Sequence, residues 1–178
     1  DNTVSGTVLV WPRLEGRPGI PAREIVVYLP PSLVERDAAS KDGRRYPVLY
    51  FHDGQNVFDD RTSFVGEWHA DETLELLASE GFEAIAVAVP NAGDARMDEY
   101  CPWRERNPFG KGHPTSGGKG DAYLDWLVGS VKPLIDRSFP TRGEREATGI
   151  IGSSMGGLIS IYALVAQPAV FGLAGVMS

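Results

Sequence analysis

A serine framed by glycines is the strongest chemical feature of this sequence. Residues 152–156 read Gly-Ser-Ser-Met-Gly, which fits the pattern G-x-S-x-G with Ser154 at its centre. The pattern follows an apolar run, ATGIIG, and precedes the amphipathic run GGLISIYALVA. A serine on a sharp turn between a buried strand and a helix exposes its hydroxyl as a nucleophile. The sequence therefore predicts covalent catalysis by Ser154 at a carbonyl carbon.

The two glycines have a steric reason to flank this serine. On such a strained turn, the residues two before and two after the serine lie against neighbouring backbone, so only glycine fits at 152 and 156. Ser153 does not satisfy the pattern, because Ile151 stands two residues before it. In the alternative interpretation, Ser154 caps a closely packed helix and performs no chemistry.

An oxyanion hole needs two backbone N–H groups that point at one position. The N–H of Met155, directly after the nucleophile at a predicted helix N-terminus, is one candidate. The second is the N–H of Gln55 in His-Asp-Gly-Gln (52–55), a loop that follows a predicted buried strand. Gly54 lets that loop turn inward. The alternative is an ordinary Asp-Gly turn.

The same loop carries closely spaced oxygen donors, at Asp53, Asn56, Asp59 and Asp60. It lacks the full twelve-residue calcium-loop pattern and an acidic residue placed to close it. We interpret these groups as solvated turn carboxylates and predict no metal site. No cofactor is expected either, because acyl transfer by serine needs none.

The elements that must position these groups alternate along the chain. Strands are predicted at 4–10, 24–29, 46–52, 83–89, 147–152 and 171–177. Helices are predicted at 68–79, 121–138 and 155–166, with Pro133 expected to kink or break the second. Two strands followed by strand–helix–strand units predict one α/β domain over 1–178, with a mostly parallel central sheet and helices on both faces.

Residues 91–120 form the longest irregular stretch, rich in Gly, Pro and charge. Long loops inside a compact domain usually cover a binding site or are disordered. Because Tyr100, Trp103 and Phe109 are interleaved with the charges, we expect this segment to lie over a binding site. The alternative is a surface loop that its aromatic residues merely hold in place.

Composition excludes several classes of protein. The 178 residues are 42% hydrophobic and 23% charged, with a net charge of -7 and no basic run, so nucleic acid is a poor partner. The apolar runs are too short to span a membrane, and the one cysteine, Cys101, rules out an internal disulfide. The first residue is Asp1, not Met, which slightly favours an exported protein, although a cytoplasmic one remains open.

Three stretches, YPVLYFHDGQNVFD, AVPNAGDARMDEYCP and IIGSSMGGLISIYALVAQPAVFGLAGVMS, resemble the esterase D / enterochelin esterase family of α/β-hydrolases. Its members include siderophore, feruloyl and acetyl-xylan esterases, S-formylglutathione hydrolase and mycolyltransferases. The resemblance, from about residue 22 to residue 178, implies an α/β-hydrolase fold, Ser154 as nucleophile, and Met155 and Gln55 as the oxyanion hole.

It also places Arg96, Glu99 and Tyr100 beside the mouth of the site. The alternative for these three is a structural Arg–Glu pair that fixes the loop. Trp103 in the same loop would suit a phenolic or sugar ester.

One departure from the family pattern concerns the rest of the catalytic triad. In an α/β-hydrolase the acid and the histidine follow the serine in the chain. No His, Asp or Glu follows Ser154, and His52, His69 and His113 all precede it. We therefore expect the C-terminal strands, with the acid and the histidine, to be missing from these residues. The strand at 171–177 would then be an exposed edge through which the chain self-associates.

The sequence thus predicts a serine carboxylesterase that acts on a small-molecule ester, for example of a siderophore, a phenol or a sugar. Two alternatives stay open. One is an acyltransferase, in which an alcohol replaces water as the acyl acceptor. The other is a non-catalytic binding or scaffold module that has kept the fold without a working triad.

Overall fold

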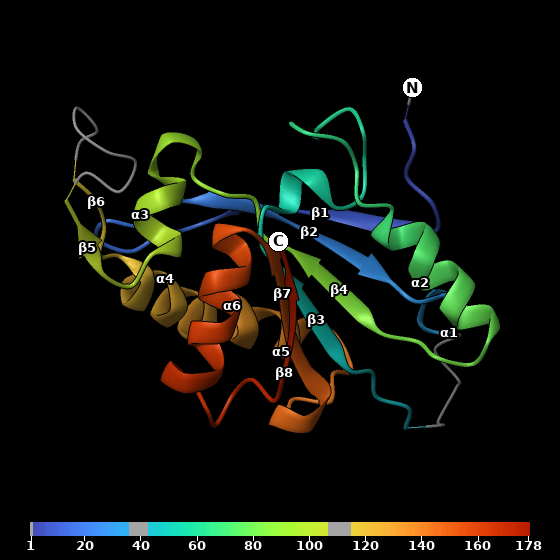
Figure 1. Ribbon diagram of the computed structural model, residues 1–178. Coiled ribbons are helices and arrows are strands. Elements are labelled where there is room, and N and C mark those ends of the chain that lie inside the picture. Colours follow the sequence, from blue (N-terminus) through green and yellow to red (C-terminus); the bar gives the residue numbers. More distant parts are fainter. Residues whose placement is uncertain (1, 36–42, 107–114) are drawn as a thin grey trace.

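The computed structural model describes residues 2–35, 43–106 and 115–178. Its centre is a six-stranded sheet with the order β1-β2-β4-β3-β7-β8 (Figure 1). The first two strands, β1 (Thr7–Leu14) and β2 (Arg23–Leu29), form an antiparallel pair, and β2 also runs antiparallel to β4. The other four are mutually parallel: β3 (Val48–Phe51), β4 (Ile85–Ala88), β7 (Thr148–Ser153) and β8 (Leu173–Met177).

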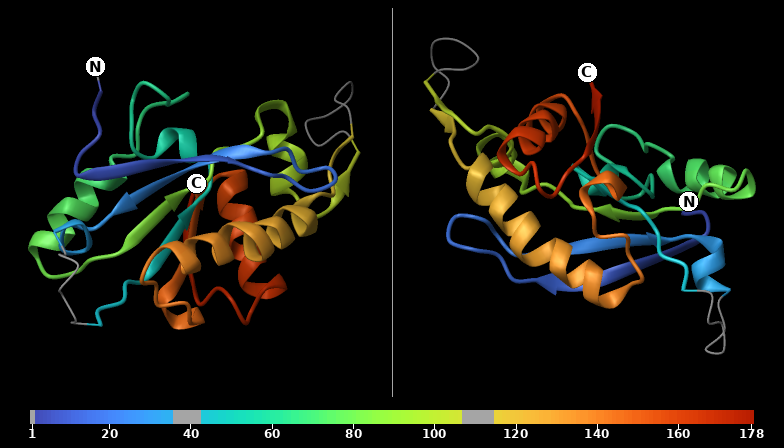
Figure 2. Two further views of the ribbon diagram at one scale, coloured as in Figure 1. Left: turned by 180° about the vertical axis from the view of Figure 1, so that it is seen from behind. Right: turned by 90° about the horizontal axis from the view of Figure 1, so that it is seen from below.

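Helices cover both faces of this sheet (Figure 2). Helix α2 (Ala70–Ser79) connects β3 to β4 on one face, and α6 (Met155–Ala166) connects β7 to β8 on the other. Beside α6 runs a long helix composed of α4 (Gly120–Trp126), η3 (Leu127–Val131) and α5 (Lys132–Ser138). Short helices complete the chain: α1 (Pro31–Val34), η1 (Gly54–Asn56), η2 (Gly93–Ala95), α3 (Arg96–Tyr100) and η4 (Arg145–Ala147). The predicted mixed α/β architecture is confirmed.

Two cores lie on opposite faces of the central strands, as the period-two alternation of a strand requires. In β3, Val48 and Tyr50 point into the larger core with the long helix and α6. Leu49 and Phe51 point to the opposite face, where they pack with α2. This burial on both faces explains why the central strands are apolar throughout.

Pro133 leaves the long helix unbroken. The irregularity lies just before it, as a π-helical turn over Leu127–Val131, in which the N–H of Lys132 donates to the carbonyl of Leu127. Proline has no N–H for the preceding turn, and a π turn is one way for a helix to absorb that loss. Of the two expected effects of Pro133, a kink or a break, the break is absent, and a π-helical turn lies directly before the proline.

The two edges of the sheet differ. β1 carries Pro12, and its pairing with β2 is irregular between Trp11 and Leu14. Proline is tolerated at such a position because it cannot donate to a ladder. At the other edge, β8 has no proline, and its Leu173 is 54% exposed.

The segment at 91–120 is more ordered than its composition suggested. Its described part contains η2, α3 and a two-stranded sheet of β5 (Arg104–Glu105) and β6 (Ser116–Gly117). Phe109 and His113 lie outside the described residues. In the part of the chain that the structure describes, no helix is long and apolar enough to cross a membrane.

Candidate active site

Ser154 lies on the turn between β7 and α6, with φ 54° and ψ -119°. A positive φ is strained for a residue with a side chain, and such strain clusters at functional sites. The turn is held by the Ser154 N–H, which donates to the carbonyl of Met177 at 2.8 Å, and by the N–H of Leu158, which donates to the Ser154 carbonyl at 3.0 Å. The backbone is therefore fixed while the serine side chain remains exposed.

The glycines around Ser154 allow this turn to close. A Cβ atom on Gly152 would lie 2.4 Å from the carbonyl carbon and oxygen of Gly156. A Cβ on Gly157 would lie 3.1 Å from the carbonyl oxygen of Met177. The expected backbone clash is thus visible at Gly152, whereas a Cβ on Gly156 would first meet the side-chain atoms His52 Cβ and Asp53 Oδ2, both at 3.3 Å.

The loop after β3 approaches the same corner. Gly54 lies so close to β4 that a Cβ there would be 2.5 Å from the nitrogen of Val89, and its own N–H donates to the Val89 carbonyl at 2.9 Å. Asp53, just before it, has a left-handed backbone with φ 53°. This geometry turns the chain into η1, so that Gln55 faces the pocket beside Ser154.

Asp53 anchors this loop with its side chain. Its carboxylate accepts hydrogen bonds from Arg96 Nε at 2.6 Å and Nη2 at 2.8 Å, and from Asn91 Nδ2 at 2.6 Å. Its backbone N–H donates to the Tyr100 hydroxyl oxygen at 3.0 Å. The hydrogen bonds from Arg96 to Asp53 raise the pKa of Arg96, so its guanidinium stays charged. The short helix α3 therefore positions the predicted oxyanion loop.

His52 is buried behind that loop. Its Nδ1 lies 2.9 Å from the Tyr123 hydroxyl oxygen, and its Nε2 has no hydrogen-bond partner. Burial lowers the pKa of His52 to about 3, with Asp53 and Arg96 acting in opposite directions as weaker influences. The imidazole is therefore neutral near pH 7, and it does not line the pocket that contains Ser154.

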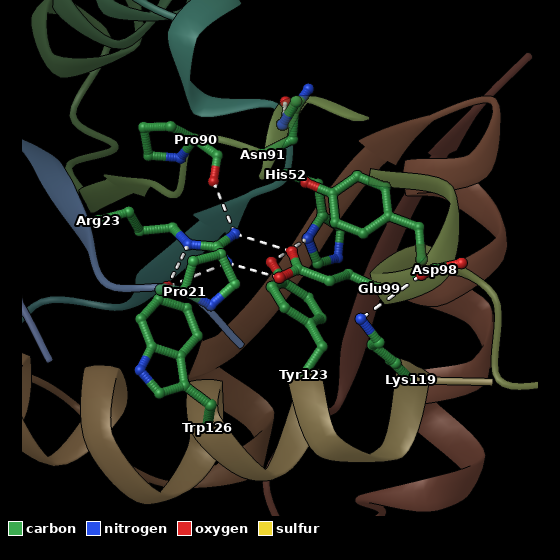
Figure 3. Close-up of polar contacts among 12 residues, drawn as sticks. Pro21, Arg23, His52, Pro90, Asn91, Asp98, Glu99, Lys119, Tyr123 and Trp126 are labelled. Carbon is green, nitrogen blue, oxygen red and sulfur yellow. Dashed lines mark hydrogen bonds and ion pairs between the residues drawn. The ribbon is translucent and has the colours of Figure 1, made fainter. Parts of the chain in front are cut away.

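A buried ion pair supports the same region from below (Figure 3). Arg23 donates to both carboxylate oxygens of Glu99, at 2.9 and 2.6 Å, and to the carbonyl of Pro90 at 3.1 Å. Its guanidinium also lies 5.0 Å from the centre of the Trp126 ring. Burial lowers the pKa of Arg23, but the hydrogen bonds and charge of Glu99 outweigh it, so the net shift is upward.

A pocket of about 880 Å³ opens in front of Ser154. Its walls combine polar groups from the loops after β3 and β4 with apolar groups from the segment before α2. The residues that line this pocket include Gln55, Phe64, Trp68, Asn91, Arg96 and Ser154. Trp68 and Ser153 also line a neighbouring apolar pocket of about 450 Å³ between α2 and the sheet.

The structure separates the four residues expected to bind substrate. Arg96 lies on the pocket wall, whereas Glu99 and Tyr100 have no exposed surface and contact other side chains instead. Trp103 is 62% exposed and packs edge-on against Tyr162, with ring centres 5.7 Å apart. The alternative of a structural Arg–Glu pair is realised with a different arginine, because Glu99 pairs with Arg23 and Arg96 pairs with Asp53.

Sequence reasoning missed the residues that fix the loop. Asn91 and Arg23 had no motif to mark them, and Asp53 was assigned to a solvated turn although it is buried and paired. One signal was available for Asn91, which stands three residues after the end of the buried strand β4, whose carboxyl end must lie near the proposed nucleophile.

Comparison with known proteins identifies the relatives of this chain. The family model described as "Putative esterase" matches residues 21–178. The chain belongs to this esterase family. It is 30% identical over 156 residues to the uncharacterized protein YbbA of Bacillus subtilis. The aligned region covers 88% of this chain and 56% of YbbA. It is also 29% identical over 129 residues to the siderophore triacetylfusarinine C esterase of Aspergillus fumigatus, covering 70% and 41% of the two chains.

Solved structures share the fold. An IroE-like serine hydrolase from Shewanella oneidensis superimposes with a TM-score of 0.71 at 24% identity, covering 96% of this chain and 49% of that one. The siderophore hydrolase EstA from Aspergillus nidulans gives a TM-score of 0.72 at 20% identity, with 96% and 56% covered. The α/β-hydrolase fold expected from the resemblance is confirmed. This chain of the esterase family spans about half the length of these relatives.

Proposed function

We propose that this protein is a serine carboxylesterase and that Ser154 forms an acyl-enzyme. The observation that carries the proposal is the exposed Ser154 on a strained turn at the edge of an 880 Å³ pocket. Membership of the esterase family and the names of several relatives, including a siderophore esterase, support it.

In the proposed reaction, Ser154 Oγ attacks the ester carbonyl carbon and its proton passes to a general base. The carbonyl oxygen becomes an oxyanion, which the N–H groups of Met155 and Gln55 stabilise. The leaving alcohol takes a proton as the carbon–oxygen bond breaks, and water then hydrolyses the acyl-enzyme. Asp53 and Arg96 act in this scheme by holding the Gln55 loop in place.

No described histidine lines the pocket, since His52 is buried behind the loop and His69 lies at the start of α2. We propose that the histidine and the acid that activate Ser154 come from outside the described residues. The same observation favours a second candidate, a binding module without catalysis, for the chain taken alone.

The substrate we propose is an ester that carries an aromatic group. Phe64, which is 88% exposed, and Trp68 line the pocket together with its polar groups. Apolar side chains beside a few fixed polar groups are typical of small-molecule sites. The names of a siderophore esterase and of ferulic acid esterases among the relatives agree with this class of substrate.

The test is hydrolysis of p-nitrophenyl acetate and butyrate, together with labelling by a fluorophosphonate and mapping of the labelled peptide. Ser154→Ala should abolish labelling and turnover, whereas Ser153→Ala, the adjacent hydroxyl, should retain the label. A full triad contributes on the order of 10⁶ in kcat, and a further factor of ~10³–10⁴ over water, from the oxyanion hole and substrate binding, remains without it. Equal labelling of the two variants would contradict the assignment of Ser154. Binding of an aromatic ester without labelling or turnover would favour the binding module when it is measured on protein that also contains the proposed histidine and acid.

A further inference from the structure

Buried carboxylate oxygens without a partner gather at the start of α2, away from Ser154. Among the described residues, Glu67 Oε1, Asp71 Oδ1 and Glu72 Oε2 are buried and accept no hydrogen bond. The Glu67 side chain is 1% exposed and Asp71 is fully buried. An unpartnered buried carboxylate oxygen is costly, so a cation bound to these carboxylates would stabilise the fold. The oxygens of Glu67 and Glu72 that lie nearest His69 are the other two of these side chains, Oε2 and Oε1.

The arrangement of these groups matches metal coordination. One ligand atom each from Glu67, His69 and Glu72 lies within 4.8 Å of the others. His69 Nδ1 is 3.6 Å from Glu67 Oε2 and 3.3 Å from Glu72 Oε1. Nitrogen and oxygen ligands ~2.0–2.1 Å from a tetrahedral zinc ion are separated by roughly 3.3 Å. The distances from His69 Nδ1 to the Glu67 and Glu72 oxygens are therefore close to the ligand–ligand distance in a zinc site.

The backbone holds the three ligands in this arrangement before any ion binds. His69 has a left-handed backbone with φ 54° at the cap of α2. On either side, the Trp68 N–H donates to the Asn56 carbonyl and the Ala70 N–H donates to the Val57 carbonyl. The N-terminal segment adds support, because the Thr3 hydroxyl donates to Glu67 Oε2 at 2.5 Å. Such outer hydrogen bonds orient ligands in metal sites.

We propose that Glu67, His69 and Glu72 bind a divalent transition-metal cation, with Zn²⁺ as the preferred ion. An imidazole with two carboxylates suits zinc, whereas calcium and magnesium favour oxygen ligands alone. Asp71 lies beside the ligands and adds negative charge. The site adjoins Trp68, whose side chain lines both pockets, so the ion fixes one wall of the substrate pocket without contacting Ser154.

The test is isothermal titration of the metal-stripped protein with ZnCl₂, and with MgCl₂ and CaCl₂ for comparison. We expect one Zn²⁺ per chain and a higher unfolding temperature that neither MgCl₂ nor CaCl₂ reproduces. Glu67→Gln and His69→Asn should each weaken zinc binding by at least about tenfold. Asparagine is chosen at 69 because it tolerates a left-handed backbone.

Glu80→Gln, at the other end of α2 and exposed, is the matched control and should bind zinc like the wild type. Glu72→Gln, at a partly exposed ligand, serves if the variant at buried Glu67 fails to fold. Zinc binding that is unchanged in the ligand variants would overturn the proposal. So would the absence of zinc binding in folded wild-type protein, which would leave a proton shared between neighbouring carboxyl groups as the explanation for the unpartnered oxygens.

Discussion

The turns after β7 and β3 lie side by side at the carboxyl edge of the sheet, and each holds a non-glycine residue at positive φ: 54° at Ser154 and 53° at Asp53. Around Ser154, residues 152, 156 and 157 are glycines, and the serine side chain is exposed. At Asp53 the side chain is buried and binds Arg96 and Asn91. The first turn is shaped by the absence of side chains around it, and the second by specific partners.

The two turns meet different requirements of the proposed site. A nucleophile must keep its hydroxyl accessible, so its turn is fixed through backbone contacts alone. An oxyanion donor must keep its N–H in place, so the residue beside it can use its whole side chain as an anchor. Backbone strain therefore marks both turns, but only one of the two residues is proposed to react.

Near neutral pH, the largest effect is expected from removing the Asp53 anchor. Arg96→Gln should lower the free energy of unfolding by about 3 kcal/mol, because it leaves a buried carboxylate with one remaining side-chain partner. Urea denaturation measures this, and a double-mutant cycle with Asp53→Asn isolates the pair. An unchanged stability with a raised KM would instead make Arg96 a substrate contact.

A smaller loss of stability is expected at the Ser154 turn. Gly152→Ala places a Cβ 2.4 Å from the Gly156 carbonyl, and the forced shift should cost about 1–3 kcal/mol of unfolding free energy. Gly143→Ala is the control, since a Cβ there would meet only side-chain atoms at 3.6 Å or beyond. Equal stability of the two variants would show that the turn is not tightly closed.

The buried His52, which precedes the turn at Asp53, should make the free energy of unfolding depend on pH. Its pKa is about 3 in the folded protein and near 6.5 when unfolded, so between these values the unfolded chain binds the extra proton. The stability that the neutral imidazole contributes is present above pH 6.5. It falls as the pH drops toward 3, by up to about 1.4 kcal/mol per pH unit. His52→Asn, which can still reach Tyr123, should flatten this part of the stability curve in denaturation series between pH 4 and 7.

Self-association of the exposed β8 edge is the prediction with the smallest effect on the fold. Sedimentation velocity at rising concentration should show dimers of the 178-residue chain, which Leu173→Lys should reduce. Val165→Lys is the control, because Val165 is exposed on α6 away from this edge. A monomer at all concentrations would contradict the prediction.

Local patterns in the sequence predicted the features that depend on neighbours in the chain. The glycines around Ser154 and the continuously apolar central strands are of this kind, so the strained turn at Ser154 and the layered fold could be predicted directly. The anchors could not, because Arg23 meets Glu99 across 76 residues and Asp53 meets Arg96 across 43. Such pairs form only once the strands have been placed, and their residue types are common on any surface.

Because Pro12 lies in β1, the two edges of the sheet differ in their ability to pair with a further strand. With a proline and an irregular ladder, β1 offers a poor template for another strand, while β8 offers an uninterrupted one. Any further strand, from whichever molecule, is expected to join past β8, next to the loop that bears Ser154. A strand added there would lie on the side of the sheet that bears the proposed site and could change its shape. The β1 edge would stay unpaired.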